Sequence, residues 1–244
     1  MTNYTGDKMI QNLNVKIYAD GAKITDMVDA YKTGVVKGFT TNPSLMKQAG
    51  VTDYIGFAKE AILKLPGLPI SFEVFADDIL KMEKEAEKIA QLGENVYIKI
   101  PIINTKCEST TPLISKLSAR GYNLNITALL TLQQIEDAVG ALAPNTKNVI
   151  SVFAGRIADT GVDPIPTMKE AKKLCVLKPG TELLWASCRE VYNIIQANDI
   201  GAEIITCPNS IINKLNMLGM DLFQVSLDTV KTFNKDISAL GINI

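Results

Sequence analysis

Short apolar segments alternate with longer amphipathic ones along nearly the whole chain. The short segments are residues 14–19, 37–39, 70–75, 96–100, 123–126, 149–153, 182–185 and 203–205. Between them, apolar residues recur at helical spacing in stretches such as 77–92 and 131–142. Several short segments are apolar on both faces, as strands of a parallel sheet covered by helices are. The pattern predicts eight strands that alternate with helices.

Eight such units in about 200 residues predict an α/β protein, a (β/α)8 TIM barrel at the compact end of that fold's size range. A doubly wound open sheet is the alternative, but no G-x-G-x-x-G motif follows any predicted strand. No Pro-, Gly- or Ser-rich linker divides the chain, so a single domain is expected over residues 1–244. Residues 220–240 predict an additional C-terminal helix with a partial apolar stripe, which either caps its own barrel or docks on a neighbouring subunit.

The charges of the chain are balanced. With 25 Lys and Arg against 26 Asp and Glu, the formal net charge is −1, which gives no electrostatic reason to expect nucleic acid or an anionic membrane as a partner. The N-terminal segment MTNYTGDKMIQNLN carries acidic and amide side chains where a signal peptide needs an apolar core, and no apolar run approaches the ~18 residues of a membrane span. We therefore expect a cytoplasmic protein.

The sequence contains no histidine. Ser-His-Asp and Cys-His nucleophile pairs are thereby excluded, as are metal sites that need imidazole. The cysteines form no C-x-x-C pair and are expected to be buried, reduced thiols: Cys107, Cys175, Cys188 and Cys207. Neither a metal nor a cofactor is expected. Lysine, carboxylates, hydroxyls and arginine remain for chemistry.

Polar residues near the predicted carboxyl ends of the strands are the site candidates, because the active face of a barrel lies there. In chain order they are Asp20, Thr40, Thr41, Asn42, Glu73, Lys99, Asn125, Thr127, Ser151, Arg156, Ser187 and Arg189. Arg156 and Arg189 follow consecutive strands beside serines. Such a pair favours an anion site, because a guanidinium fork fits a phosphate and a hydroxyl completes its shell. Arg120, at a predicted helix end, is expected to be solvated.

Lys99 lies between Ile98 and Ile100 in an apolar strand. An ammonium left unpaired there would be costly, so the amine is expected to lose its proton and to attack carbonyls, forming a Schiff base. The alternative is that Lys99 reaches solvent or pairs with a carboxylate such as Glu73 on the adjacent strand. Glu73 and Asp20 are the available proton carriers. Lys16, the other strand lysine, should lie about 13 Å from Asp20 at ~3.3 Å per residue, and is expected to be structural or paired.

Seven segments that carry these candidates occur in order on successive predicted strands: YADGA, GFTTNPS, SFEVFAD, VYIKIP, NLNITALL, ISVFAGRIAD and WASCRE. This set closely resembles the transaldolases over residues 14–208. The resemblance implies a class I reaction of the pentose phosphate pathway, without metal or cofactor. A ketose phosphate, such as fructose 6-phosphate or sedoheptulose 7-phosphate, is cleaved. Its dihydroxyacetone unit is held on a lysine and passed to an aldose phosphate.

The resemblance also implies a role for each candidate. Lys99 would be the Schiff-base lysine and Asp20 the acid/base of carbon–carbon cleavage, while Glu73 and Thr127 would hold the catalytic water. The remaining residues would bind substrate: Asn42, Asn125 and Ser151 the dihydroxyacetone hydroxyls, and Arg156, Ser187 and Arg189 the phosphate.

Fructose 6-phosphate aldolases share the short barrel but have a glutamine where this chain has Glu73 and a tyrosine where it has Phe153. A phenol there can protonate the carbanion and release dihydroxyacetone, whereas the Phe153 side chain next to the substrate cannot. A lyase nevertheless stays an alternative, and so does a non-catalytic sugar-phosphate binder. A sulfonate, as in 6-deoxy-6-sulfofructose, would also suit two arginines. The compact subfamily forms rings of five or ten subunits with a C-terminal helix in the contacts, which implies a homo-oligomer.

Overall fold

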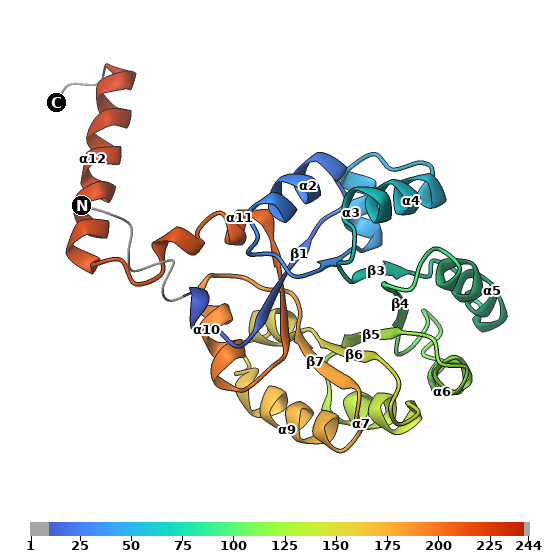
Figure 1. Ribbon diagram of the computed structural model, residues 1–244. Coiled ribbons are helices and arrows are strands. Elements are labelled where there is room, and N and C mark those ends of the chain that lie inside the picture. The colour runs from blue at the N-terminus through green and yellow to red at the C-terminus, as the bar shows by residue number, and fades with distance from the viewer. Residues whose placement is uncertain (1–9, 242–244) are drawn as a thin grey trace. The chain divides into compact units, whose positions relative to one another are not determined.

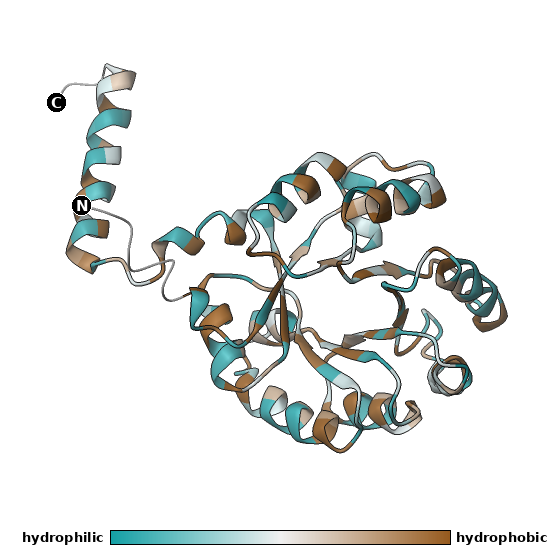
Figure 2. Ribbon diagram, in the orientation of Figure 1, coloured by the Kyte–Doolittle hydropathy of each residue, from teal (hydrophilic) through white to brown (hydrophobic). Residues whose placement is uncertain are grey.

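The computed structural model describes residues 10–241 (Figure 1). Eight parallel strands form a closed barrel in chain order, which confirms the predicted (β/α)8 architecture. The strands are β1 (Lys16–Asp20), β2 (Phe39–Thr40), β3 (Ile70–Glu73), β4 (Val96–Pro101), β5 (Leu124–Leu129), β6 (Asn148–Val152), β7 (Thr181–Trp185) and β8 (Ile204–Pro208). Figure 2 shows the hydrophobic residues concentrated in these strands.

The helices alternate with the strands as the periodicity predicts. They are α2 (Ile24–Lys32), α3 (Pro43–Gln48), α4 (Tyr54–Lys64), α5 (Ile79–Ala90), α6 (Thr111–Ala119), α7 (Leu132–Ala141), α8 (Ala154–Asp159), α9 (Ile165–Val176), α10 (Tyr192–Asp199), α11 (Asn209–Ile212) and α12 (Leu222–Leu240), with a 3-10 turn at Leu215–Met217. The predicted ranges 77–92 and 131–142 were slightly too long. Asp78 caps α5 through the Lys81 amide, and Thr131 forms a capping box with Gln134 at the start of α7.

All eight strands differ from their predicted ranges by one to three residues. The second lies at residues 39–40 rather than 37–39, and the eighth extends to Pro208 rather than ending at 205. The fifth continues beyond residue 126, where its register against β6 shifts, so that Ile126 pairs with Ile150 but Leu129 pairs with Val152. One extra residue of β5 is accommodated there, which is a β-bulge.

The barrel interior is a packed core rather than a channel. Its apolar cluster is built from Tyr18, Val149, Leu184, Ala186 and Ile204, with Tyr97 and Phe153 packed against it. Gly38 faces the same cluster, and a Cβ there would lie 2.5 Å from the Tyr18 ring, so only glycine fits. Leu184, Ala186 and Phe153 belong to this core or pack against it, and they also line the cavity described below.

Lys16 is paired, as expected. Its Nζ lies 2.5 Å from Glu182 Oε1, on the strand two places away in the barrel, and Lys16 does not line the cavity described below. The expectation that all four cysteines are buried is wrong for Cys107, which is exposed on the loop after β4, where its φ is 61°. Cys175, Cys188 and Cys207 are buried and unpaired by disulfides.

The chain divides into two compact units, one of which is the barrel, Asn14–Ile212. The other includes α12, a helix of 19 residues capped by Asp221 at its start and by Gly241, at φ 64°, at its end. None of its residues is buried, and its apolar side chains Leu222, Phe223, Val230, Phe233 and Ile237 are exposed. The single domain over residues 1–244 and the role of this helix stay predictions. Within residues 10–241, no helix has the length and apolar character that crossing a membrane requires.

Candidate active site

Ten of the eleven residues for which the resemblance implies a role in the site line one cavity of about 440 Å³. They are Asp20, Asn42, Glu73, Lys99, Thr127, Ser151, Phe153, Arg156, Ser187 and Arg189. They come from seven different strands or the segments that follow them. They meet because the carboxyl ends of all parallel strands of a barrel open at the same mouth. The eleventh residue, Asn125, is buried and does not line this cavity.

Lys99 is the buried cation of the cavity. Register places it beside Glu73 on β3, and its Nζ lies 3.0 Å from Glu73 Oε2. The same Nζ donates a hydrogen bond of 2.9 Å to the Thr41 carbonyl oxygen. The alternative that Lys99 pairs with the Glu73 carboxylate is therefore confirmed, and a buried lysine stays charged at lower cost beside such a partner. The same contact would let Glu73 accept a proton from Lys99.

Asp20 is the last residue of β1 and lines the cavity. Its Oδ1 accepts a hydrogen bond of 2.8 Å from Thr40, and its Oδ2 accepts one of 3.4 Å from the Asn42 amide. Burial raises the pKa of Asp20 above its usual range, and the charge of Lys99 and the Thr40 hydrogen bond only partly oppose this. Glu73 adds to the increase through like-charge repulsion. A carboxyl that takes up a proton more readily than usual is suited to acid/base work.

A chain of buried hydrogen bonds supports the cavity from inside the barrel. Ser151 Oγ donates to Asn125 Oδ1 at 2.6 Å, and Asn125 Nδ2 donates to Ser71 Oγ at 2.9 Å. Asn125 thus orients Ser151, which does face the cavity. That Asn125 itself binds substrate hydroxyls stays a prediction.

Thr127 faces the cavity from the bulge in β5. Its neighbour Ala128 has a φ of 60°, a conformation that costs energy for a residue with a side chain. The Thr127 hydroxyl is buried and has no hydrogen-bond partner among residues 10–241. Since a buried hydroxyl normally has a partner, this one is available to a water or a substrate atom.

The two arginines are held differently. The Arg156 guanidinium lies 5.2 Å from the centroid of the Phe153 ring, a cation–π arrangement. Arg189 instead makes a bidentate pair with Asp159, with Nε 3.1 Å from Oδ1 and Nη2 2.5 Å from Oδ2. The pairing lowers the pKa of Asp159. Between the two arginines, Ser187 adopts a φ of 62°.

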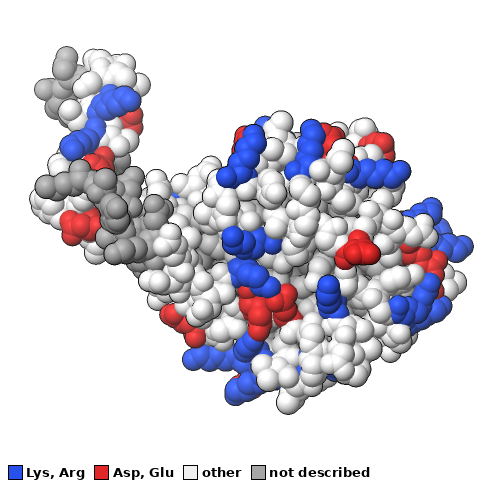
Figure 3. All heavy atoms as spheres, viewed as in Figure 1, with Lys and Arg blue, Asp and Glu red and all other residues white. Residues whose placement is uncertain are grey.

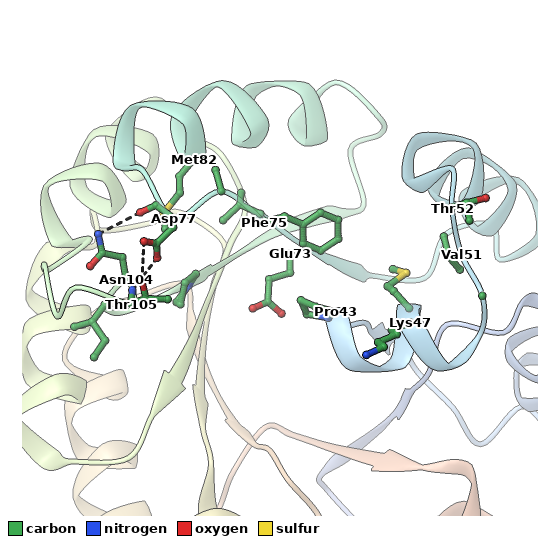
Figure 4. A pocket seen from close by; sticks show the side chains of 16 residues that line it. Pro43, Lys47, Val51, Thr52, Glu73, Phe75, Asp77, Met82, Asn104 and Thr105 are labelled. Atoms are coloured by element: carbon green, nitrogen blue, oxygen red, sulfur yellow. Dashed lines mark hydrogen bonds between the residues drawn. The ribbon is translucent and has the colours of Figure 1, made fainter.

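A larger cavity of about 870 Å³ lies on the other side of Glu73, and Figure 4 shows it. It shares Pro43 and Glu73 with the first cavity and is otherwise largely apolar. On one side, Asp77 accepts hydrogen bonds from the backbone and side chain of Thr105 (Figure 4). Neither Lys99 nor either arginine lines it, so the reactive groups are in the smaller cavity.

The rest of the described surface offers no comparable group of functional residues. Figure 3 shows basic and acidic side chains interspersed over the visible face. Arg120, expected to be solvated, is partly exposed and pairs with Glu87 at 2.6 Å. Within residues 10–241, no three Cys, Asp or Glu side chains gather as a metal site would require.

Sequence reasoning missed three groups that shape the site. Thr206 lines the cavity, and its hydroxyl forms a hydrogen bond of 2.6 Å with the Thr40 hydroxyl. The sequence signal for this residue was a polar side chain within the apolar run of β8. Ser71, inside β3, supports Asn125 and carries the same signal. Asp159 was missed because a carboxylate on a short helix is most often a surface charge.

Comparison with known proteins agrees with the geometry. The sequence profile of the family described as transaldolase/fructose-6-phosphate aldolase matches residues 17–244. Proteins named probable transaldolase from Thermoanaerobacter sp. and Ruegeria sp. are 31% and 32% identical, each over 94% of this chain and all of their own length. One from Dehalococcoides mccartyi is 32% identical over 82% of this chain and 90% of its own.

Solved structures support the fold alone. A dihydrodipicolinate synthase from Rhodopseudomonas palustris superposes with a TM-score of 0.53 at 11% identity, over 79% of this chain and 69% of the other. The family profile and the full-length relatives decide the classification: this chain belongs to the transaldolase/fructose-6-phosphate aldolase family.

Proposed function

We propose that the protein is a transaldolase that moves a dihydroxyacetone unit from fructose 6-phosphate or sedoheptulose 7-phosphate to an aldose phosphate through a Schiff base on Lys99. The observation that carries the proposal is the position of the Lys99 amine. It is buried in the barrel, 3.0 Å from Glu73 and close to Asp20, in a cavity that also holds two arginines.

The first half of the reaction forms the imine. Lys99 gives a proton to Glu73, and its lone pair attacks the ketone carbon of the donor to form a carbinolamine. Protonation of the carbinolamine hydroxyl releases water and leaves an iminium, with Glu73 as the nearest proton donor. The free hydroxyl of Thr127 supports the assignment of Glu73 and Thr127 as the pair that holds this water.

The second half breaks and remakes a carbon–carbon bond. Asp20 removes the proton from the donor C4 hydroxyl, the C3–C4 bond breaks, and its electrons flow into the iminium to give an enamine. The aldose phosphate leaves. The enamine carbon then attacks the aldehyde of the acceptor, Asp20 returns its proton to the new alkoxide, and water hydrolyses the product from Lys99. The raised pKa of Asp20 suits both proton transfers.

Borohydride trapping tests the proposal. With fructose 6-phosphate present, reduction should add a stable mass to the peptide that contains Lys99. Lys99→Arg keeps a cation beside Glu73 but cannot form an imine, and it should lose both the adduct and turnover. Lys16→Arg is the matched control and should keep both, because Lys16 pairs with Glu182 outside the cavity. Normal turnover in Lys99→Arg would refute the mechanism.

Transfer rather than release follows from Phe153, which lines the cavity and has no proton to donate. Without an acceptor aldehyde, the wild-type protein should release little free dihydroxyacetone from fructose 6-phosphate. Phe153→Tyr places a phenol near the enamine and should raise that release several-fold. An enzymatic assay for dihydroxyacetone measures both. Rapid release by the wild type would favour the lyase instead.

A further inference from the structure

We propose that Asp159 is a positioning residue for the anionic end of the substrate, because it fixes the guanidinium of Arg189 in the orientation that receives that anion. The assignment rests on the proposed sugar-phosphate site. Asp159 itself does not line the cavity, whereas Arg189 does.

The contact is geometrically specific. Both oxygens of Asp159 are used, Oδ1 by Arg189 Nε at 3.1 Å and Oδ2 by Arg189 Nη2 at 2.5 Å. This side-on, bidentate arrangement fixes the plane of the guanidinium as well as its distance. The Arg189 side chain is 48% exposed, so without Asp159 it would sample several rotamers.

The pairing also determines which donors are left for substrate. A guanidinium has five N–H groups, of which Asp159 occupies the one on Nε and one on Nη2. The donors on Nη1 and the second one on Nη2 stay available. Arg189 therefore offers the anion the edge of its fork that points away from Asp159, and it does so before the anion arrives.

The position of Asp159 in the fold makes it a link between the two arginines. Asp159 is the last residue of α8, and Arg156 lies three residues before it on the same helix. Arg189 comes from the segment after β7 and also bonds through its backbone amide to Asn193. The Asp159–Arg189 pair therefore ties the segment after β7 to α8 and fixes the spacing of the two cations.

A carboxylate at an anion site has two opposite effects, and they can be distinguished. As a negative charge it repels the ligand, so its removal would tighten binding. As a positioning group it orders Arg189, so its removal would weaken binding. The bidentate geometry and the exposure of Arg189 favour the second effect, because an ordered guanidinium loses less conformational freedom when the anion binds.

Ligand binding tests this without depending on catalysis. The probes are glucitol 6-phosphate and glucitol, which have no carbonyl and cannot form an imine. Calorimetry with the wild type should show that glucitol 6-phosphate binds much more tightly than glucitol. Asp159→Ala should weaken glucitol 6-phosphate binding about tenfold and leave glucitol unchanged, while Asp159→Glu should recover part of the loss. Asp137→Ala, which removes a carboxylate that accepts a hydrogen bond from Gln133 on α7, is the matched control and should change neither.

Turnover supplies a second readout. Asp159→Ala should raise KM for fructose 6-phosphate and leave kcat near the wild-type value, whereas general damage to the barrel would lower kcat as well. Equal or tighter binding of glucitol 6-phosphate by Asp159→Ala would overturn the proposal, and so would equal losses for both probes. A phosphate-specific loss together with no borohydride adduct on wild-type Lys99 would overturn the transaldolase mechanism and leave the role of Asp159 standing.

Discussion

At the scale of single residues, three titratable groups of the site interact. Lys99 and Glu73 form an ion pair, and the charges of both act on the pKa of Asp20. In the proposed mechanism, Lys99 must be neutral to attack and Asp20 must be ionised to act as a base. That mechanism therefore depends on how protons are distributed among the coupled groups of the cavity.

The pH dependence of activity should report Asp20. Its pKa lies above the usual range of an aspartate because burial disfavours the charged form. Since the ionised carboxylate accepts the C4 hydroxyl proton in the proposed mechanism, kcat/KM should fall as pH is lowered through this raised pKa. A pH–rate profile with saturating acceptor measures it. Asp20→Asn should reduce turnover at every pH by about a hundredfold or more, and an acidic limb unchanged in the residual activity of that variant would assign it to another group.

The raised pKa of Asp20 also means that its ionised form, which the reaction would need, lowers the stability of the fold. A carboxyl whose pKa is higher in the folded than in the unfolded chain destabilises the fold once it is ionised, and this cost is absent below the unfolded value. Asp20→Asn should therefore stabilise the protein by about 1 kcal/mol near neutral pH. The gain should vanish as pH falls toward the unfolded-state pKa. Thermal melts across this range test it, and a Tm below wild type at neutral pH would contradict it.

At the scale of elements, the residues at and after the strand ends could be predicted, but their depth in the barrel and their side-chain partners could not. A polar side chain in an apolar strand, such as Lys99 in β4, is expected to face the barrel axis near the end of the strand. Because the barrel is closed, such side chains from different strands lie close together. The depth of each residue depends on the stagger of the strands, which sequence does not reveal. For that reason the sequence predicts Asn125 in the cavity, whereas the structure buries it behind the cavity lining, where it accepts a hydrogen bond from Ser151.

The contact between α8 and the segment after β7 is one such unpredicted feature. Gly155, in the first turn of α8, packs so closely on Ser187 that a Cβ would overlap the Ser187 carbonyl oxygen. Gly155→Ala should push α8 away and separate Arg156 from Arg189, raising KM for phosphorylated donors more than it lowers kcat. Gly140→Ala is the control, since a Cβ on that α7 residue meets nothing within 4 Å. Steady-state kinetics with both variants make the comparison, and equal KM values would refute the role of this contact.

At the scale of the whole molecule, the exposed apolar side chains of α12 are the surface feature that most favours association with another protein. The chain carries a net charge of only −1, so electrostatic repulsion does little to keep copies apart. The apolar residues of α12 are exposed on a helix with no buried residue, and a monomer rarely leaves such a stripe uncovered.

A homo-oligomer held by α12 is therefore the expected state, with a second copy of the chain covering the stripe. Light scattering should give a mass several times that of one chain. The double substitution Phe223→Ser, Phe233→Ser removes the largest exposed rings and should dissociate the assembly, because burial of aromatic surface dominates such contacts. Asn234→Ser, a polar change on the same helix, should leave the mass unchanged. A wild-type protein that stays monomeric at high concentration would mean that the stripe has a different partner.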